Sequence, residues 1–125
     1  MNNIKSRIKK SIAVKKAMLL HCSAAINRAS NQMHQTIKRG RKMLLCGNGG
    51  SAADAQHFSS ELIGKFEKVR NPFAAMSLCT DNSAITSISN DFSFDDIFAR
   101  QIKGIGEQED LLIIISTSGN SKYIL

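Results

Sequence analysis

The sequence predicts an α/β fold in which a parallel sheet is flanked by helices and preceded by a pair of N-terminal helices. Short apolar runs at 43–46, 74–78 and 111–115 alternate with segments of helical periodicity. Strands that alternate with helices in this way form right-handed βαβ units and a doubly wound sheet. The continuous Leu/Ile run at 111–115 is typical of a strand that is covered on both faces.

Residues 3 to about 40 predict the N-terminal helices. Isoleucines recur every four residues at 4–12, and apolar residues keep a similar spacing at 26–37. Gly40 follows at the position expected for a helix stop. These apolar stripes exceed what a three-stranded sheet could cover, so we expect them to pack against equivalent helices of a neighbouring copy.

Three more helices are expected among the strands. The first begins with Ser51-x-x-Asp54, a pattern similar to a capping box, and runs to about residue 66. The second is short and covers 82 to about 89. The third covers about 95–106 and turns three apolar side chains inward: Ile97, Phe98 and Ile102.

The charge of the chain is concentrated at its N-terminus. Residues 1–42 hold eleven Lys or Arg and no Asp or Glu, whereas the rest holds six Lys or Arg and all ten acids. A basic segment can attract nucleic acid, but no aromatic side chain is interleaved here to stack on bases. We therefore favour a solvated helix face and do not expect a nucleic-acid partner.

Composition also limits the compartment. The three cysteines are odd in number and widely spaced, which indicates free thiols in a reducing cytoplasm. No apolar run approaches the ~20 residues that cross a bilayer, so no membrane segment is expected. A cleaved signal peptide is not expected either, because His21 interrupts the apolar run before it and helical periodicity continues through it.

Two polar loops follow the first and last predicted strands. Gly47-Asn48-Gly49-Gly50-Ser51 allows close backbone approach to a sugar, with Asn48 and Ser51 as hydrogen-bond partners, and Ala52 departs from a dinucleotide fingerprint. The loop at 116–121 offers hydroxyls and backbone N–H groups that suit a phosphate, although a polar turn with a Ser cap is the alternative. The sequence thus predicts a sugar phosphate held between two loops that meet at one rim, with Glu61 pointing into the space they enclose. Residues 1–42 are expected to be an oligomerisation segment and 43–125 the binding domain.

Two further pairs are candidates for chemistry. His57 and Glu61 are one helical turn apart, so they could bind a divalent metal together, act as an acid–base pair, or form an ordinary surface pair. Asn90-Asp91 is expected in a loop between helices, where Asp91 could bond sugar hydroxyls or cap a turn.

Four segments together resemble the sugar isomerase (SIS) family, and within it the phosphoheptose isomerases: 46–51, 54–61, 90–92 and 115–121. The resemblance implies a flavodoxin-like fold, a homotetramer and an aldose–ketose isomerisation of sedoheptulose 7-phosphate, the first step of heptose synthesis for lipopolysaccharide or another surface polysaccharide. It implies one zinc ion per subunit, with His57 and Glu61 as two ligands and Glu61 as the catalytic carboxylate. The positions that match substrate contacts of the family are Asn48, Gly49, Gly50, Asn90, Asp91, Ser116, Thr117, Ser118 and Ser121.

The resemblance has two departures. The other zinc ligands and the catalytic histidine of the family lie beyond residue 125, so we expect the chain to be the N-terminal part of a longer protein. Lys65 stands where the family usually has Arg, and an ammonium does not reproduce a bidentate guanidinium.

Two alternatives to an isomerase remain open from the sequence. Related SIS proteins have lost catalysis and act as adaptors, one of them for the bacterial replication initiator protein. Glu61 argues against an adaptor, because an adaptor needs no carboxylate there. A domain that senses a sugar phosphate without turning it over is the other alternative.

Overall fold

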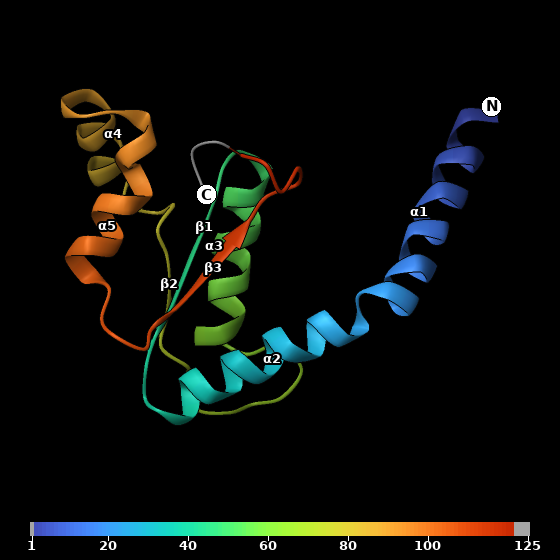
Figure 1. Ribbon diagram of the computed structural model, residues 1–125, viewed down its shortest axis with the longest axis horizontal. Coiled ribbons are helices and arrows are strands. Elements are labelled where there is room, and N and C mark those ends of the chain that lie inside the picture. The colour runs from blue at the N-terminus through green and yellow to red at the C-terminus, as the bar shows by residue number, and fades with distance from the viewer. Residues whose placement is uncertain (1, 122–125) are drawn as a thin grey trace. The chain divides into compact units, whose positions relative to one another are not determined.

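The computed structural model describes residues 2–121 of the chain (Figure 1). By packing, the chain divides into two units, one up to His34 and one from Gln35 on. The boundary expected from the sequence, between residues 42 and 43, lies eight residues later. The elements of the described chain, in order, are α1 (Asn2–His21), α2 (Ser23–Lys38), β1 (Met43–Gly47), α3 (Gly50–Ile63), β2 (Ala75–Ser77), α4 (Asn82–Asp91), η1 (Phe94–Asp96), α5 (Ile97–Ile105) and β3 (Leu111–Ile115).

The N-terminal helices end as the sequence predicts. A turn at Cys22 separates α1 from α2, and Gly40 adopts a φ of 68° just after α2. The N–H of Gly40 donates to the carbonyl of Ile37 at 2.9 Å, and the N–H of Arg41 donates to the carbonyl of Thr36 at 3.0 Å. This pair of bonds is the Schellman motif, which glycine favours because it tolerates a positive φ.

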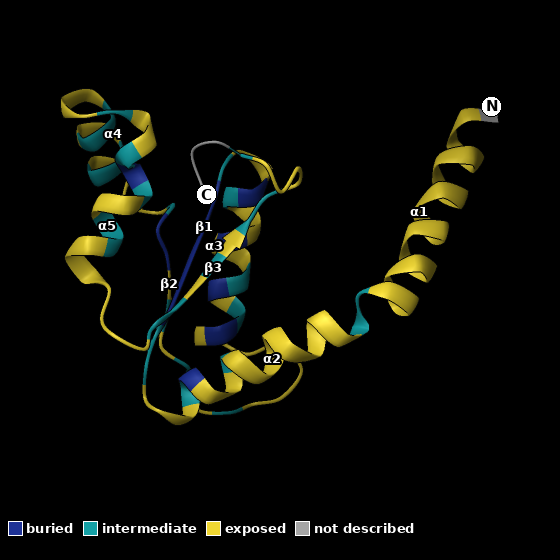
Figure 2. Cartoon of the chain, viewed as in Figure 1, coloured by how far each residue is buried: buried dark blue, intermediate teal, exposed yellow. Residues whose placement is uncertain are grey.

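The sheet is parallel and has the strand order β2-β1-β3. Met43 of β1 pairs with Ala75 on one side and with Leu111 on the other. The central strand β1 is buried at every position, as Figure 2 shows. Parallel strands with helical crossovers bury the sheet on both faces, which explains the apolar composition of β1.

Helices cover β1 on both faces. Leu44 and Cys46 belong to a core cluster against which Phe98 and Ile102 of α5 pack. Successive strand residues point to opposite faces, so Met43 and its alternate neighbours face the other side, where α3 lies against the sheet. The α/β prediction and the inward face of α5 are confirmed, and Figure 1 shows the two helical layers.

Two details of the sequence-based prediction are wrong. In β3, Leu112 and Ile114 are 39% and 36% exposed, because β3 is an edge strand of the described sheet and α5 packs on the central strand β1 instead. The capping box is also absent: α3 begins at Gly50 with Gly49 as its N-cap, and no side chain caps it. Ser51 therefore lies inside the first helical turn.

A cluster of charges joins the segment before β1 to the turn before β3. Lys42 Nζ lies 2.7 Å from Asp110 Oδ2, and Arg41 Nη1 lies 2.8 Å from Glu107 Oε2. The Asp110 side chain is only 6% exposed and also accepts the backbone N–H groups of Lys42 and Glu107. Burial alone would raise the pKa of Asp110, but the hydrogen bonds from Lys42 and Glu107 outweigh it and lower that pKa.

Candidate functional site

The two polar loops leave the same edge of the sheet. Gly47, the last residue of β1, pairs directly with Ile115, the last residue of β3. Because the strands are parallel, Asn48 and Ser116 both start their loops at the carboxyl edge. The structure therefore brings together the two segments that the sequence singled out, at the edge where ligands bind in open α/β sheets.

The glycine loop turns sharply into α3. Gly49 has a φ of 57°, in the region that favours glycine. The N–H of Ser51 donates to the carbonyl of Asn48 at 3.0 Å, and Ser51 is buried, whereas Gly49 and Gly50 are exposed. The two glycines thus place bare backbone at the start of a helix, where an anion or a sugar oxygen can approach closely.

The serine loop folds its hydroxyls over its own backbone. Ser116 Oγ accepts from the N–H of Gly119, and Ser118 Oγ accepts from the N–H of Asn120, both at 3.2 Å. Gly119 has a φ of 64°, and Thr117 is exposed. These N–H groups and hydroxyls form a set of donors that phosphate oxygens can engage by displacing the internal bonds. Ser121 ends the described loop, and the helix expected after it falls on residues outside the description.

A cavity of about 220 Å³ lies beside the glycine loop. Asn48 and Gly49 line it on one side, and apolar side chains of α4, η1 and α5 line the other. The thiol of Cys79 also lines it and donates to the carbonyl of Gly47 at 3.3 Å. The sequence analysis missed Cys79 as a site residue, and only its place one residue after the second predicted strand could have indicated it.

Asn90 and Asp91 are the last two residues of α4, so the expectation of a loop there is wrong. The helix runs on because Ile88 O accepts from the N–H of Phe92 at 3.0 Å. Asn90 Nδ2 donates to Asp91 Oδ1 at 2.8 Å. Asn90 borders a second hollow that shares three apolar wall residues with the cavity beside the glycine loop: Ile85, Phe94 and Ile97.

His57 and Glu61 share one face of α3, as the spacing predicts. His57 Nε2 lies 3.6 Å from Glu61 Oε1, and the two side chains are 75% and 29% exposed. An imidazole and a carboxylate at this separation suit a zinc ion chemically. Within residues 2–121, however, no group of three or more His, Cys, Asp or Glu side chains could hold a metal, so the pair is at most part of a ligand set.

The expectation that Glu61 points into the space between the two loops is wrong within one copy of the chain. Glu61 stands eleven residues after Gly50 on α3, which is roughly 16 Å along a helix that rises 1.5 Å per residue. At that end, Leu62 O accepts from the N–H of Phe73, two residues before β2 begins. The helix runs antiparallel to the strands and carries Glu61 to the amino edge of the sheet, away from the loops.

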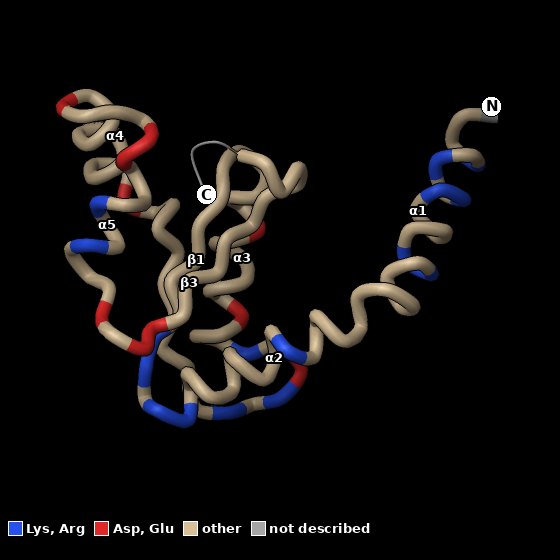
Figure 3. The backbone as a smooth tube through the Cα atoms, in the orientation of Figure 1, with Lys and Arg blue, Asp and Glu red and all other residues tan. Residues whose placement is uncertain are grey.

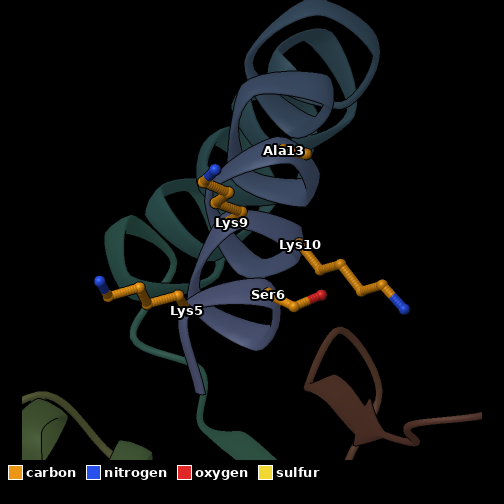
Figure 4. A pocket seen from close by; sticks show the side chains of 5 residues that line it. All are labelled: Lys5, Ser6, Lys9, Lys10 and Ala13. Atoms are coloured by element: carbon orange, nitrogen blue, oxygen red, sulfur yellow. The ribbon is translucent and has the colours of Figure 1, made fainter. Parts of the chain in front are cut away.

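The basic face of α1 forms no converging site. A shallow hollow is lined by five residues of this one helix: Lys5, Ser6, Lys9, Lys10 and Ala13. Figure 4 shows that the lysine side chains point in different directions, and Figure 3 shows that α1 carries Lys and Arg but no acid. The arrangement is typical of a solvated helix face. None of the helices within residues 2–121 is long and apolar enough to cross a membrane.

The profile of the SIS domain matches residues 8–125 of the chain. The chain belongs to the SIS domain family. The match begins at residue 8, so the family pattern includes most of the N-terminal helices as well as the sheet. The resemblance drawn from the four motifs is confirmed.

Relatives and solved structures agree with this family. The chain is 52% identical over 97 residues to the phosphoheptose isomerase of Campylobacter concisus, covering 78% of the chain and 51% of the relative. It is 46% identical over 125 residues to the phosphoheptose isomerase of Shewanella denitrificans, covering 100% of this chain and 64% of the relative. A structure of phosphoheptose isomerase GmhA from Neisseria gonorrhoeae matches with a TM-score of 0.88 and 40% identity, over 96% of this chain and 62% of that one. A structure of a phosphoheptose isomerase from Francisella tularensis matches with a TM-score of 0.92 and 38% identity, over 98% of this chain and 64% of that one.

The chain spans about half to two thirds of the length of these relatives. The SIS fold, with helices on a parallel sheet, is shared over nearly the whole of the present chain. All of these relatives are named as isomerases, so an adaptor for the replication initiator is not favoured.

Proposed function

We propose that this SIS domain is part of a phosphoheptose isomerase, which converts D-sedoheptulose 7-phosphate to D-glycero-D-manno-heptose 7-phosphate. The observation that carries the proposal is the pairing of Gly47 with Ile115, which sets both polar loops at one edge in a chain whose relatives are named phosphoheptose isomerases. The serine loop binds the phosphate, and the glycine loop lies against the sugar. Fixing the phosphate orients the carbon atoms that react at the other end of the substrate.

Glu61 moves the proton in this mechanism. Its carboxylate removes a proton from the carbon next to the carbonyl, which gives an enediolate, and returns it to the neighbouring carbon. A carboxylate suits this task because it accepts a proton in one step and donates it in the next. His57 lies on the same helix face, with its Nε2 3.6 Å from Glu61 Oε1, and orients the Glu61 carboxylate. The family histidine expected beyond residue 125 would act as the acid that moves protons on the two substrate oxygens.

A zinc ion is the proposed cofactor. His57 and Glu61 supply two donors of the types that zinc prefers, and further ligands are expected from outside residues 2–121. A bound zinc ion would stabilise negative charge on the substrate oxygens.

The site is proposed to form between copies of the chain. Glu61 is at the amino edge and the loops are at the carboxyl edge, roughly 16 Å apart along α3 by the helical rise. A second copy whose α3 approaches the loops of the first would complete the site. Such a site requires at least two copies, and the exposed apolar side chains of the N-terminal helices, such as Ile4, Ile8 and Ile26, offer a surface for the proposed homotetramer.

The product would enter heptose synthesis for lipopolysaccharide or a similar surface polysaccharide. We place the reaction in the cytoplasm, which agrees with the three free cysteines of the chain.

The decisive test is an isomerase assay with sedoheptulose 7-phosphate, run on this chain and on the longest protein that its reading frame encodes. Glu61→Gln is expected to lower turnover by about 10²–10⁴, the usual contribution of a general base. Full turnover in Glu61→Gln would remove Glu61 from the mechanism. Substrate that the longest protein binds without forming product would indicate a sensing domain instead.

A mixing experiment tests the shared site. Glu61→Gln and the double variant Ser116→Ala/Ser118→Ala are each expected to be inactive. If Glu61 and the loops come from different copies, random hybrids recover about a quarter of wild-type activity, because a quarter of their sites have both parts intact. Hybrids that stay inactive would place the complete site within one copy.

A further inference from the structure

The end of α3 is held by an arginine from outside the helix. Arg70 Nη2 donates to the carbonyl of Glu61 at 2.7 Å, and Arg70 Nη1 donates to the carbonyl of Leu62 at 2.8 Å. Nη1 also reaches the carbonyl of Asn71 at 3.0 Å. The last carbonyls of a helix have no hydrogen-bond donors within the helix, and here the guanidinium of Arg70 provides the donors.

Arg70 is itself fixed in place. Its Cζ lies 3.9 Å from the centre of the Phe73 ring, so the guanidinium stacks on an aromatic face. The N–H of Phe73 donates to Leu62 O at 3.1 Å, which closes the segment from Arg70 to Phe73 back onto the helix. The last turn of α3 carries no basic residue of its own, so this segment provides the cation at that helix end.

We infer that Arg70 is a positioning residue for Glu61. It binds the main-chain carbonyl of Glu61 and thereby fixes the backbone from which the carboxylate side chain extends. The inference rests on the proposed function, because it gives Arg70 a role in turnover through Glu61. Two contacts act on Glu61 from different sides. Arg70 holds its backbone, and His57 lies 3.6 Å from its carboxylate.

The contact depends on the planar fork of arginine. A guanidinium binds two adjacent carbonyls while it stacks on a ring, whereas an ammonium is a compact charge without that geometry. Arg70→Lys therefore keeps the charge and loses the paired contact to Glu61 and Leu62. Small misplacements of a reacting group lower turnover strongly, while substrate binding through the two polar loops is unaffected.

The experiment compares wild type, Arg70→Lys and Arg70→Ala in the full protein. Arg39→Lys is the matched control, because the Arg39 guanidinium bonds the exposed Glu109 at 3.2 Å and lies outside the proposed site. We expect Arg70→Lys to lower kcat about tenfold per folded molecule and to leave KM within about twofold. Added guanidinium at millimolar concentration should restore part of the kcat of Arg70→Ala. It should not raise the kcat of Glu61→Gln.

Amide hydrogen exchange at residues 61–64 gives a readout that does not depend on activity. Exchange is expected to accelerate in both Arg70 variants and to stay unchanged in Arg39→Lys. Unchanged exchange would overturn the anchoring of Glu61, whether or not the protein is an isomerase. Accelerated exchange with wild-type kcat would overturn the positioning role. A wild type that does not convert sedoheptulose 7-phosphate would reject the proposed function, while the exchange data would still decide whether Arg70 anchors Glu61.

Discussion

Gly47 at the end of β1 lies against Ser51 in the first turn of α3. A Cβ atom on Gly47 would stand 2.6 Å from the carbonyl oxygen of Ser51 and 2.8 Å from its Cβ. Real Cβ atoms essentially never approach other atoms so closely. The absence of a side chain at Gly47 therefore lets α3 start directly over the strand, which is what places Gly49 and Gly50 at the carboxyl edge.

Gly47→Ala should destabilise the fold. The added methyl group must move the helix start or the strand end, and overpacking of this kind costs about 1–3 kcal/mol. We expect a lower midpoint in urea and weaker binding of sugar phosphate. Gly104→Ala is the control, because Gly104 lies in α5 and a Cβ atom there would meet nothing within 4 Å beyond its own helix backbone. Alanine favours a helix interior over glycine, so this variant should be neutral or up to about 1 kcal/mol more stable. Equal stability of the two variants would contradict the close contact.

Asp110→Asn should weaken the link between the segment before β1 and β3. The carboxylate binds Lys42 Nζ and two backbone N–H groups, and its side chain is almost fully buried. Replacing the charge is expected to cost about 1–3 kcal/mol, as measured by urea unfolding at pH 7. Glu109→Gln, which removes an exposed pair with Arg39, should change stability by less than about 1 kcal/mol.

The same carboxylate predicts an acid dependence of stability. Despite its burial, the hydrogen bonds from Lys42 and Glu107 hold the pKa of Asp110 below its ordinary 3.8. A group with a lowered pKa in the folded state stabilises the fold above its unfolded pKa and loses this effect as the pH falls through its folded pKa. Unfolding free energy of the wild type should thus drop below about pH 4, and Asp110→Asn should show a smaller drop. If the unfolding free energies of the two proteins fell in parallel below about pH 4, the Asp110 carboxylate would not be the source of the acid dependence.

Asp81→Ala should loosen α4, the helix that carries Asn90 and Asp91. Asp81 is the N-cap, and its Oδ1 accepts from the N–H of Ala84 at 2.9 Å. Loss of such a cap costs about 0.5–2 kcal/mol. Asp81→Asn keeps the acceptor and serves as the control. Hydrogen exchange within α4 should accelerate in the alanine variant alone, and equal exchange in both variants would show that this cap is dispensable.

Local patterns in the sequence were enough for most of the fold. The alternation of apolar runs and helical segments predicted the three strands of residues 2–121, and Gly40 predicted the end of α2, which the structure closes with a Schellman motif. The shared edge of the two loops was predictable for a similar reason, since parallel strands have one carboxyl edge, whereas the pairing of Gly47 with Ile115 was not.

Relations between distant segments were not predictable. The spacing of His57 and Glu61 showed a shared helix face, but not that α3 carries Glu61 away from the loops. Arg70 had no local signal, because its role arises only when the chain folds back on the end of α3. The exposure of Leu112 depends on which strands α5 covers, which is a tertiary property.

The three cysteines should differ in reactivity, and Cys46 should be the inert one. Burial raises the pKa of the Cys46 thiol to about 11, with a smaller contribution from neighbouring Cys79. At pH 8 only about one Cys46 in a thousand is then the reactive thiolate. Iodoacetamide on the folded protein should label Cys22 and Cys79, which are half-buried, and leave Cys46 unmodified in the mass spectrum. Labelling in 8 M urea should modify all three, and Cys79→Ser should remove one label without exposing Cys46. If Cys46 in the folded protein reacted as fast as Cys22, the central strand would not be closed to solvent as the packing of α5 on β1 requires.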